Sequence, residues 1–370
     1  KSADGSYWVW IPRYAYKIET CYHTSGEDCL ALTGKEAGDI DVKFLKSTTN
    51  LTDDNTTIES TGYEAHVKDT SMHHFLHPAF QFNGEELGLW VAKFEPTARE
   101  GVASGTKSCN AEDNVISKTV IIIPNASSWR CINISNSFKT TLQMRSKNNI
   151  YGWQNNELNT HMMTNVEWGA VAYLSTSQYG TIDEVWNNSH INYTTGCAGS
   201  DTSASSEVNC IVYNSEGGVK SSSTQNIYGI YDMSGGAWDR VMANYNNLLG
   251  SSGFTKIELQ NIEPKYITKY TTYPEDILNN IGMDYDLTIY GDAIYETSHS
   301  ANRNNATEWV GSGDASWYLD YSYLPYSTIP WFHRGGRFDY GSLTGIFAFR
   351  DSGGDARYNV SFRPILTPLK

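Results

Sequence analysis

The sequence WFHRGG at residues 331–336, with GSLTGIFAF at 341–349 and SFRP at 361–364 after it, carries the strongest pattern in this chain. Small and aromatic residues punctuate the segment, and the side chains between them follow no hydrophobic period. Glycine permits tight turns and close approach of two chain segments, whereas aromatic side chains anchor a core. The pattern therefore indicates a rigid frame that presents a chemically mixed set of side chains, as a binding surface does.

The frame is expected to use residues that suit turns and cores, namely Trp331, Gly335, Gly336, Gly341, Gly345, Ile346, Phe347, Phe362 and Arg363. We expect Arg334 and Arg363 to donate forked hydrogen bonds to carbonyl groups or to a carboxylate such as that of Asp232 or Asp239. Such a frame would fix the backbone by contacts other than those to a ligand, so the specificity of the surface could change without refolding.

The side chains between the frame positions are the candidate ligand-binding residues, because tyrosine, arginine and other aromatic residues supply large contact area at modest entropic cost. They are Phe332, His333, Arg337, Asp339, Tyr340, Phe349, Arg350, Asp351, Asp355, Arg357 and Tyr358. An alternative is that about half of them are ordinary surface or core residues, and Phe338 and Phe349 fit a core equally well. The Tyr-rich stretch 317–323 either adds a rim to the surface or is a loop that packs on the domain.

The composition favours an extracellular binding protein. Of the 370 residues, 39% are hydrophobic, and this share is skewed toward 25 Tyr and 11 Trp, while only 18% are charged. A surface rich in tyrosine and small polar residues suits adaptable hydrogen bonds and aromatic contacts. The formal net charge of -14 disfavours nucleic acid and anionic membranes, which would repel the average surface. The sequence contains no apolar run long enough to cross a bilayer, so we expect no membrane insertion.

The six cysteines fall into three pairs that are local in sequence: Cys21 with Cys29, Cys109 with Cys131, and Cys197 with Cys210. None of the pairs has the C-x-x-C spacing, which disfavours zinc or thioredoxin chemistry. We predict three disulfides that staple polar, irregular segments, although other pairings are open. The alternative is a set of thiols in a reducing cytosol.

Regular elements are predicted mainly in the first half of the chain. Residues 7–18 are β-prone, with Pro12 at an edge strand or a bulge, and residues 87–95 alternate as a half-buried strand does. One helix is expected from Ser135 to Arg145. A second is expected to begin at a capping box formed by Thr164 and Glu167, and its helical period is kept by Val166, Ala170, Tyr173 and Leu174.

The rest of the chain is more irregular. Residues 226–240 form a turn-rich motif that leads into a strand, and residues 19–70, 181–222 and 246–325 are polar insertions, the last of them interpreted as loops over the core. The simplest organisation is a single elaborated α+β domain over residues 1–370, rich in loops.

Four blocks in this order resemble domains of the formylglycine-generating-enzyme, or sulfatase-modifying-factor, type. Residues 87–95 resemble the strand that introduces the family's framework, and residues 164–174 are similar to its "EW…A…Y" helix. The sequence NIYGIYDMSGGAWDR at 226–240 resembles the signature N-x-x-G-L-Y-D-M-x-G-N-V-W-E-W, and residues 331–363 are similar to the C-terminal "RGG…FR" block. The resemblance implies a C-type lectin-like fold, a compact mixed sheet with two helices and long loops.

The resemblance also permits a test for enzymatic activity. The oxidising members of the family use cysteine thiolates, often with copper, after the RGG block, whereas the last cysteine here is Cys210. Related sulfoxide-forming enzymes hold iron with three histidines, and the one histidine cluster here is His73, His74 and His77, before Pro78. A packed turn is the preferred interpretation of that cluster. We therefore expect no catalytic residues and no enzyme.

The chain most resembles the variable proteins of diversity-generating retroelements, which share the fold and the C-terminal block. In these relatives a reverse transcriptase mutates adenines in a C-terminal cassette, for which the candidate here is 331–366. The resemblance implies a ligand- or receptor-binding protein of a bacterial or phage surface, such as an adhesin on a cell, pilus or virion. The alternatives are a structural filament or decoration subunit, and a sulfatase-modifying-type oxidoreductase.

The resemblance also bears on cofactors and partners. Calcium-dependent lectins use Glu-Pro-Asn or Gln-Pro-Asp, and neither tripeptide occurs here. Some relatives bind calcium beside the signature, which would correspond to Asn226 and Asp232, but Gly236 replaces the family's usual asparagine. No cofactor is therefore expected apart from that calcium hypothesis. The expected partner is a protein or glycan on another cell or surface, with a homo-oligomer or a larger assembly as a further expectation.

Overall fold

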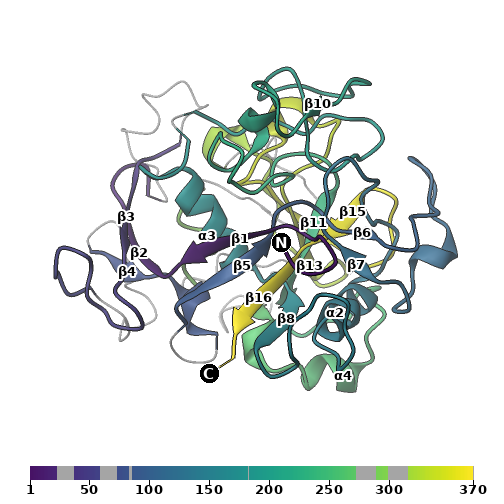
Figure 1. Ribbon diagram of the computed structural model, residues 1–370, viewed down its shortest axis with the longest axis horizontal. Coiled ribbons are helices and arrows are strands. Elements are labelled where there is room, and N and C mark those ends of the chain that lie inside the picture. Colours follow the sequence, from purple (N-terminus) through teal and green to yellow (C-terminus); the bar gives the residue numbers. More distant parts are fainter. Residues whose placement is uncertain are drawn as a thin grey trace.

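The computed structural model describes residues 1–22, 37–58, 73–82, 86–181, 183–271, 289–298 and 316–369. These residues form several small β-sheets with few helices between them, so the expected mixed α+β class is confirmed. Figure 1 shows strands crossing the middle of the molecule, with α3 to their left and α2 to their right.

Four antiparallel strands join the two ends of the described chain. Strand β16 lies between β5 and β8, and β1 pairs with the other edge of β5. As predicted, Pro12 lies in an edge strand, where its missing N–H costs no ladder hydrogen bond. The four strands are β1 (Trp8–Pro12), β5 (Gly88–Ala92), β16 (Pro364–Pro368) and β8 (Leu158–Met162).

A five-stranded sheet is built around the long strand β11 (Trp238–Tyr245), which begins with the last three residues of the turn-rich motif, so that motif leads into a strand as expected. One edge of β11 pairs with an antiparallel strand from the C-terminal block, β13 (Trp331–Arg334), which in turn pairs with β14 (Phe349–Ser352). The other edge pairs in parallel with β15 (Val360–Phe362) and β12 (Thr268–Tyr270). The segment first singled out in the sequence thus supplies three strands of this sheet.

The remaining sheets are smaller. The expected strand over residues 7–18 is divided at Arg13, where the chain leaves the four-stranded sheet and enters a three-stranded one. That sheet contains β3 (Ile40–Phe44), β2 (Tyr14–Ile18) and β4 (Phe75–Leu76). Two further pairs are β6 (Thr97–Ala98) with β7 (Val120–Ile121), and β9 (Cys197–Ala198) with β10 (Ile211–Val212). Short 3₁₀ helices are η1 (Pro78–Gln81), η2 (Ala111–Asp113), η3 (Gly218–Ser221), η4 (Pro264–Tyr266), η5 (Trp317–Leu319) and η6 (Gly341–Leu343).

Both predicted helices are present. Helix α2 (Ile134–Gln143) is capped by Asn133, and α3 (Asn165–Ser175) begins with the predicted capping box, in which the Thr164 side chain and the Glu167 side chain each accept a backbone N–H. The predicted helical period does not mark one buried face of α3. Almost every side chain of α3 is buried, because strands and loops cover it on all sides, while Val166 and Leu174 are only partly buried.

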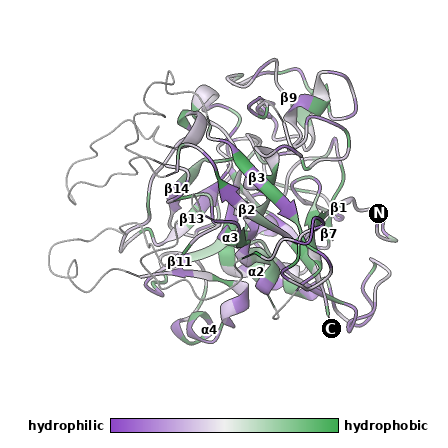
Figure 2. Ribbon diagram, turned by 90° about the vertical axis from the view of Figure 1, so that its left-hand side faces the viewer, coloured by the Kyte–Doolittle hydropathy of each residue, from purple (hydrophilic) through white to green (hydrophobic). Residues whose placement is uncertain are grey.

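The interpretation of residues 246–325 as loops is also corrected. Their described part contains strand β12 and the short helix α4 (Lys256–Gln260), which lies at the edge of the molecule (Figures 1 and 2). A capping box of Thr255 and Glu258 starts α4, and this signal was present in the sequence.

Two of the three predicted disulfides lie wholly within the described residues and are confirmed: Cys109–Cys131 and Cys197–Cys210. The predicted partner of Cys21, Cys29, lies outside the described residues. Among the helices that the structure describes, none has the length and apolar character that a bilayer-spanning segment needs.

Arg363 lies between β15 and β16, where the chain passes from the five-stranded to the four-stranded sheet. Its buried guanidinium donates through Nε to Asp239 Oδ2 on β11 at 3.0 Å, and through Nη1 to the carbonyl of Ala92 on β5 at 2.9 Å. Nη2 donates to the carbonyl of Asp232 at 3.0 Å. The predicted fork is confirmed, and one side chain joins both sheets and the turn-rich motif.

Replacing Arg363 by Lys tests this junction. A single ammonium cannot reproduce a planar set of hydrogen bonds to acceptors on three segments, so we expect the free energy of unfolding to fall by roughly 2–4 kcal/mol. Chemical denaturation of R363K beside the wild type measures the change. The exposed Arg99 provides the matched control R99K, which should be neutral. A loss no larger for R363K than for R99K would contradict the junction.

Candidate functional site

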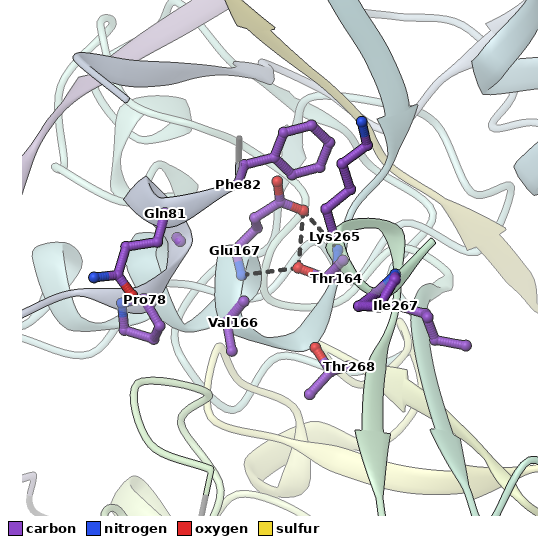
Figure 3. Close-up of a pocket in the computed structure, with 11 residues that line it drawn as sticks. Pro78, Gln81, Phe82, Thr164, Val166, Glu167, Lys265, Ile267 and Thr268 are labelled. Atoms are coloured by element: carbon purple, nitrogen blue, oxygen red, sulfur yellow. Dashed lines mark hydrogen bonds between the residues drawn. The ribbon is translucent and has the colours of Figure 1, made fainter. Parts of the chain in front are cut away.

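A pocket of about 380 Å³ opens beside the start of α3, between η1 and η4. Figure 3 shows Phe82, Glu167 and Lys265 among its lining residues. The Glu167 carboxylate is already engaged, since it accepts hydrogen bonds from Thr164 and lies 2.7 Å from Nε2 of the buried His161. Glu167 therefore acts as the cap of α3, and neither of its carboxylate oxygens is left free to bind a ligand in the pocket.

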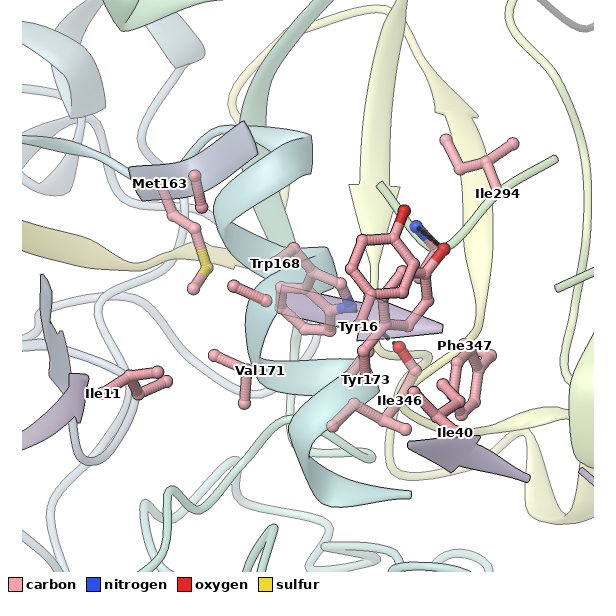
Figure 4. Close-up of a cluster of buried hydrophobic side chains, with 14 of the residues drawn as sticks. Ile11, Tyr16, Ile40, Met163, Trp168, Val171, Tyr173, Ile294, Ile346 and Phe347 are labelled. Carbon is pink, nitrogen blue, oxygen red and sulfur yellow. Dashed lines mark hydrogen bonds between the residues drawn. The ribbon is translucent and has the colours of Figure 1, made fainter. Parts of the chain in front are cut away.

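The C-terminal block is anchored on the buried core by close backbone contacts. The indole Nε1 of Trp168 donates to the carbonyl of Ile346 at 2.7 Å, and Figure 4 shows Trp168 in the same hydrophobic cluster as Ile346 and Phe347. Gly345 leaves room for the buried Asp320, since a Cβ at this position would lie 2.0 Å from a carboxylate oxygen. The predicted frame role of Gly345, Ile346 and Phe347 agrees with these contacts.

Arg334, the last residue of β13, anchors this strand through its side chain. Its Nη1 and Nη2 donate to the carbonyls of Asp292 and Ala293, both at 3.0 Å, so this arginine forks onto carbonyl groups, as predicted, and not onto Asp232 or Asp239. Gly335 and Gly336 follow with φ of 85° and 77°, a left-handed conformation that favours glycine. The arginine and the glycines set the direction in which the chain leaves the strand.

Strand alternation divides the candidate residues between two faces. Phe332 and Phe349 are 0% exposed in the main core, so the expectation that they contact a ligand from the surface is wrong. Neighbouring residues of a strand point to opposite faces, and His333 and Arg350, which are directly opposite each other on β13 and β14, therefore lie on the other side of the sheet. His333 is itself 5% exposed, and Asp351 is 6% exposed.

Aromatic and cationic side chains gather on that other side, which we call the Trp238 face. Its members are Trp238, Tyr321, His333, Tyr340 and Arg350. The Trp238 ring stacks on His333 with 6.1 Å between centroids, and meets Tyr340 and Tyr321 edge-on at 5.6 and 6.0 Å. Arg350 donates through Nη1 to the hydroxyl of Tyr340 at 2.6 Å, and its guanidinium lies 5.5 Å from the Tyr321 centroid. Rigid rings thus surround a charge at a partly exposed surface.

The other candidates surround this face or lie beside it. Arg337 pairs with Asp339 and lies over the Tyr340 ring at 4.7 Å. Asp351 carries a carboxylate 3.6 Å from Arg350, and the exposed Arg357 pairs with Asp355 at 2.9 Å. Tyr358 is partly exposed, and its carbonyl accepts a hydrogen bond from the buried Arg130.

Burial dominates the electrostatics of the face. It lowers the pKa of His333 well below its usual value, and the nearby charges of Arg240, Arg350 and Arg357 act in the same direction, so His333 is neutral at physiological pH. Burial also lowers the pKa of Arg240 to about 9, against an opposing effect of Asp355.

The histidines near Pro78 do not converge. Nε2 of His74 lies 2.8 Å from Asp41, whereas the buried His77 accepts the N–H of Ala79 and caps η1, as expected for a packed turn. Asp232 is an internal acceptor for the N–H groups of Gly196 and Glu95. Within the described part of the chain, no three His, Cys, Asp or Glu side chains are arranged to hold a metal ion.

Sequence reasoning missed Trp238 and Arg240 as members of the site. Both belong to the 226–240 motif, which indicated a turn before a strand and a family resemblance but no binding role for these two residues. The alternation of β11 gives a partial signal, since Trp238 and Arg240 share a face. Their position next to His333 is set by the pairing of β11 with β13, which joins segments far apart in the sequence. Tyr321, from the proposed rim, does lie on the Trp238 face.

Comparisons with models of known protein families and with curated proteins find no match to this chain.

The carboxyl of Asp292, beside the Arg334 fork, gives a prediction about pH. Burial raises its pKa to about 7, and it accepts hydrogen bonds from Tyr270 and from the N–H of Ile294. Because the ordinary value is near 4, the native state binds the extra proton, and this stabilisation is lost as pH rises toward 7, by up to about 1.4 kcal/mol per unit.

Asp292→Asn keeps the shape of the side chain and removes the titration. We expect the wild type to lose stability relative to D292N between pH 5 and 7 in urea unfolding. The exposed Asp53 supplies the control D53N, whose curve should run parallel to the wild type. A D292N curve parallel to the wild type would show that this carboxyl does not titrate in that window.

Proposed function

We propose that this chain is a non-catalytic ligand- or receptor-binding protein whose C-terminal block presents the binding surface. The observation that carries the proposal is that β13, β14 and the adjoining loops separate fully buried side chains from exposed tyrosine and arginine side chains. Phe332, Arg334 and Phe349 are fully buried frame residues, while Arg350 and the adjoining Tyr340 and Arg357 are partly or fully exposed. Tyrosine and arginine are the residue types that most often dominate binding energy at an interface.

A C-type lectin-like fold of the formylglycine-generating-enzyme type is the proposed architecture. The blocks that carry the resemblance are packed together. Strand β5 pairs with β16, the N–H of Met242 on β11 donates to the carbonyl of Met163, two residues before α3, and β11 pairs with β13 and β15. The Arg363 junction links the signature motif to the C-terminal block. These contacts support the proposal because they make the resembling segments one connected framework.

Within that fold, the chain is proposed to be a variable protein of a diversity-generating retroelement, with 331–366 as the cassette. The support is the mixture of fixed frame positions and chemically varied surface positions in this segment. An adenine-rich near-copy of the cassette beside a reverse-transcriptase gene is the expected genomic observation. Its absence would remove the diversification proposal and leave the binding proposal standing.

An extracellular setting, on a cell surface, pilus or virion, is proposed from the disulfides Cys109–Cys131 and Cys197–Cys210, which persist in oxidising compartments. The proposed partner is a protein or glycan on another surface, because a net charge of -14 repels nucleic acid. We also propose a calcium ion near the signature motif and self-assembly of the chain, and both proposals rest on the resemblance alone.

Two other functions differ in what they require. A sulfatase-modifying oxidoreductase of the thiolate type needs cysteine after the RGG block, and the sequence has none beyond Cys210. A filament or decoration subunit needs the fold but not the exposed tyrosine and arginine side chains, so it predicts that their removal leaves function intact.

A ligand screen separates the binding protein from the spacer. The labelled chain is applied to arrays of glycans and extracellular protein domains, beside a triple variant with Tyr340, Arg350 and Arg357 changed to Ala. The matched control changes Tyr228, Arg99 and Lys147, all exposed elsewhere, to Ala. We expect binding by the wild type and the control, and a loss of at least tenfold, about 1.4 kcal/mol or more, in the site variant.

Equal binding by all three proteins would contradict the site. Failure of the wild type to bind any member of either array would favour the spacer.

A further inference from the structure

Two members of the Trp238 face and the adjacent buried Arg240 carry nitrogen atoms without hydrogen-bond partners among the described residues. They are Nε1 of Trp238, Nε and Nη1 of Arg240, and Nε2 of His333. Buried polar nitrogens normally find acceptors, because leaving one unpaired costs its full desolvation. A group of four such atoms in one place is therefore a feature that needs a physical explanation.

Other buried indoles and guanidinium groups in the described residues find more acceptors. The indoles of Trp129, Trp168 and Trp331 donate to backbone carbonyls at 2.7–3.0 Å. Arg363 uses all three of its guanidinium nitrogens. Arg240, equally buried, makes one hydrogen bond, from Nη2 to the carbonyl of Asp355. Single unpaired nitrogens also occur elsewhere, as at Nε of Arg334, but four of them lie together on the neighbouring residues Trp238, Arg240 and His333.

The register of the sheet brings these nitrogens together. Arg240 and His333 are directly opposite each other on β11 and β13, and His333 is opposite Arg350 on β14. Directly paired residues of antiparallel strands lie on one face with their Cβ atoms about 5 Å apart. Trp238 is two residues before Arg240, hence on the same face, and stacks on His333. The row crosses three neighbouring strands.

The charge at this place is opposite to that of the whole chain. Arg240, Arg350 and Arg357 all act on His333, and the carboxylates nearest to them are those of Asp351 and Asp355. Three guanidinium groups thus outnumber the two carboxylates paired with them, on a protein whose formal net charge is -14. Asp355 is already paired with Arg357, which leaves Arg240 without a carboxylate partner among the described residues.

A bound anion would balance the excess positive charge and would accept hydrogen bonds from the unpaired nitrogens. A carboxylate offers acceptors to several donors at once and pairs well with a guanidinium, whereas the neutral imidazole can donate from Nε2 in one tautomer. The face is covered by Tyr340 and Arg350, which bond each other and are both partly exposed.

We propose that Trp238, Arg240 and His333 form the floor of an anion site on the binding face, which takes a carboxylate group of the ligand, with Arg350 and Tyr340 at its entrance. This inference rests on the proposed function, because it names the ligand chemistry that the same face recognises. A carboxylate of this kind can come from an acidic sugar or from an acidic peptide side chain.

The indole N–H of Trp238 reports directly on the site in ¹H–¹⁵N NMR spectra. Its signal is assigned as the one missing from W238F. The probes are sodium acetate, N-acetylneuraminic acid and a glutamate-containing tripeptide, each compared with its uncharged amide at equal ionic strength. We expect the Trp238 signal to shift in a saturable way with the acids and not with the amides. The stronger of the two larger acids identifies the source of the carboxylate.

Variants test the assigned donors. R240Q should weaken the apparent acetate affinity at least tenfold, and R350Q, at the partly exposed entrance, at least threefold. R99Q should match the wild type. If R240Q does not fold, as judged by its circular dichroism spectrum, R350Q decides the outcome. A Trp238 signal that does not move with acetate, or that moves equally with acetamide, overturns the proposal, as does an unchanged affinity in R350Q and every folded R240Q sample.

The outcome is separable from that of the ligand screen. A saturable acetate response in a protein that binds no array member keeps the anion site and removes the receptor function. Array binding that survives R240Q and R350Q, without an acetate response, keeps the receptor function and removes the anion site.

Discussion

The fork of Arg363 is the interaction on which the rest of the structure depends. At this residue the chain leaves the five-stranded sheet for the four-stranded one, and the guanidinium bonds to Asp239 on β11 and to the carbonyl of Ala92 on β5. A buried charge is expensive unless every donor finds an acceptor. Because the acceptors belong to separate segments, the guanidinium is satisfied only when both sheets and the signature turn are in place together.

This constraint also bears on the proposed binding face, because a small number of buried contacts hold the C-terminal block that would present it. The buried guanidinium groups of Arg363 and Arg334 anchor the C-terminal block through hydrogen bonds to other segments. The hydrogen bond from Trp168 to the Ile346 carbonyl anchors the same block to α3. Alternation along β13 and β14 then separates the core side chains from those of the Trp238 face. Substitutions on the exposed side leave the buried contacts in place, so the surface can change while the frame persists. The proposed display function and the proposed carboxylate site both follow from this separation.

The sequence predicted the parts of the fold that local chemistry determines. The capping box of Thr164 and Glu167 predicted the start of α3, and the pairing of Cys109 with Cys131 followed from proximity. The fork of Arg363 was predicted from residue type. The environment of each residue was harder to predict. Phe332 and Phe349 are core residues because of strand alternation, and this alternation is difficult to recognise in a glycine-rich segment. Arg240 and His333 meet only through the pairing of β11 with β13, a contact between segments far apart in the chain. Local patterns cannot specify such a contact, so the floor of the candidate site was beyond sequence reasoning.

Saturation mutagenesis of residues 331–366, scored by resistance of the displayed chain to protease, distinguishes the buried frame positions from the exposed ones. We expect Arg337, Tyr340, Arg350 and Arg357 to accept most substitutions with the fold retained, whereas Arg334, Gly345 and Arg363 should accept almost none. Equal tolerance in the two groups, or greater tolerance at Arg334 and Arg363, would contradict a frame that carries its binding face independently.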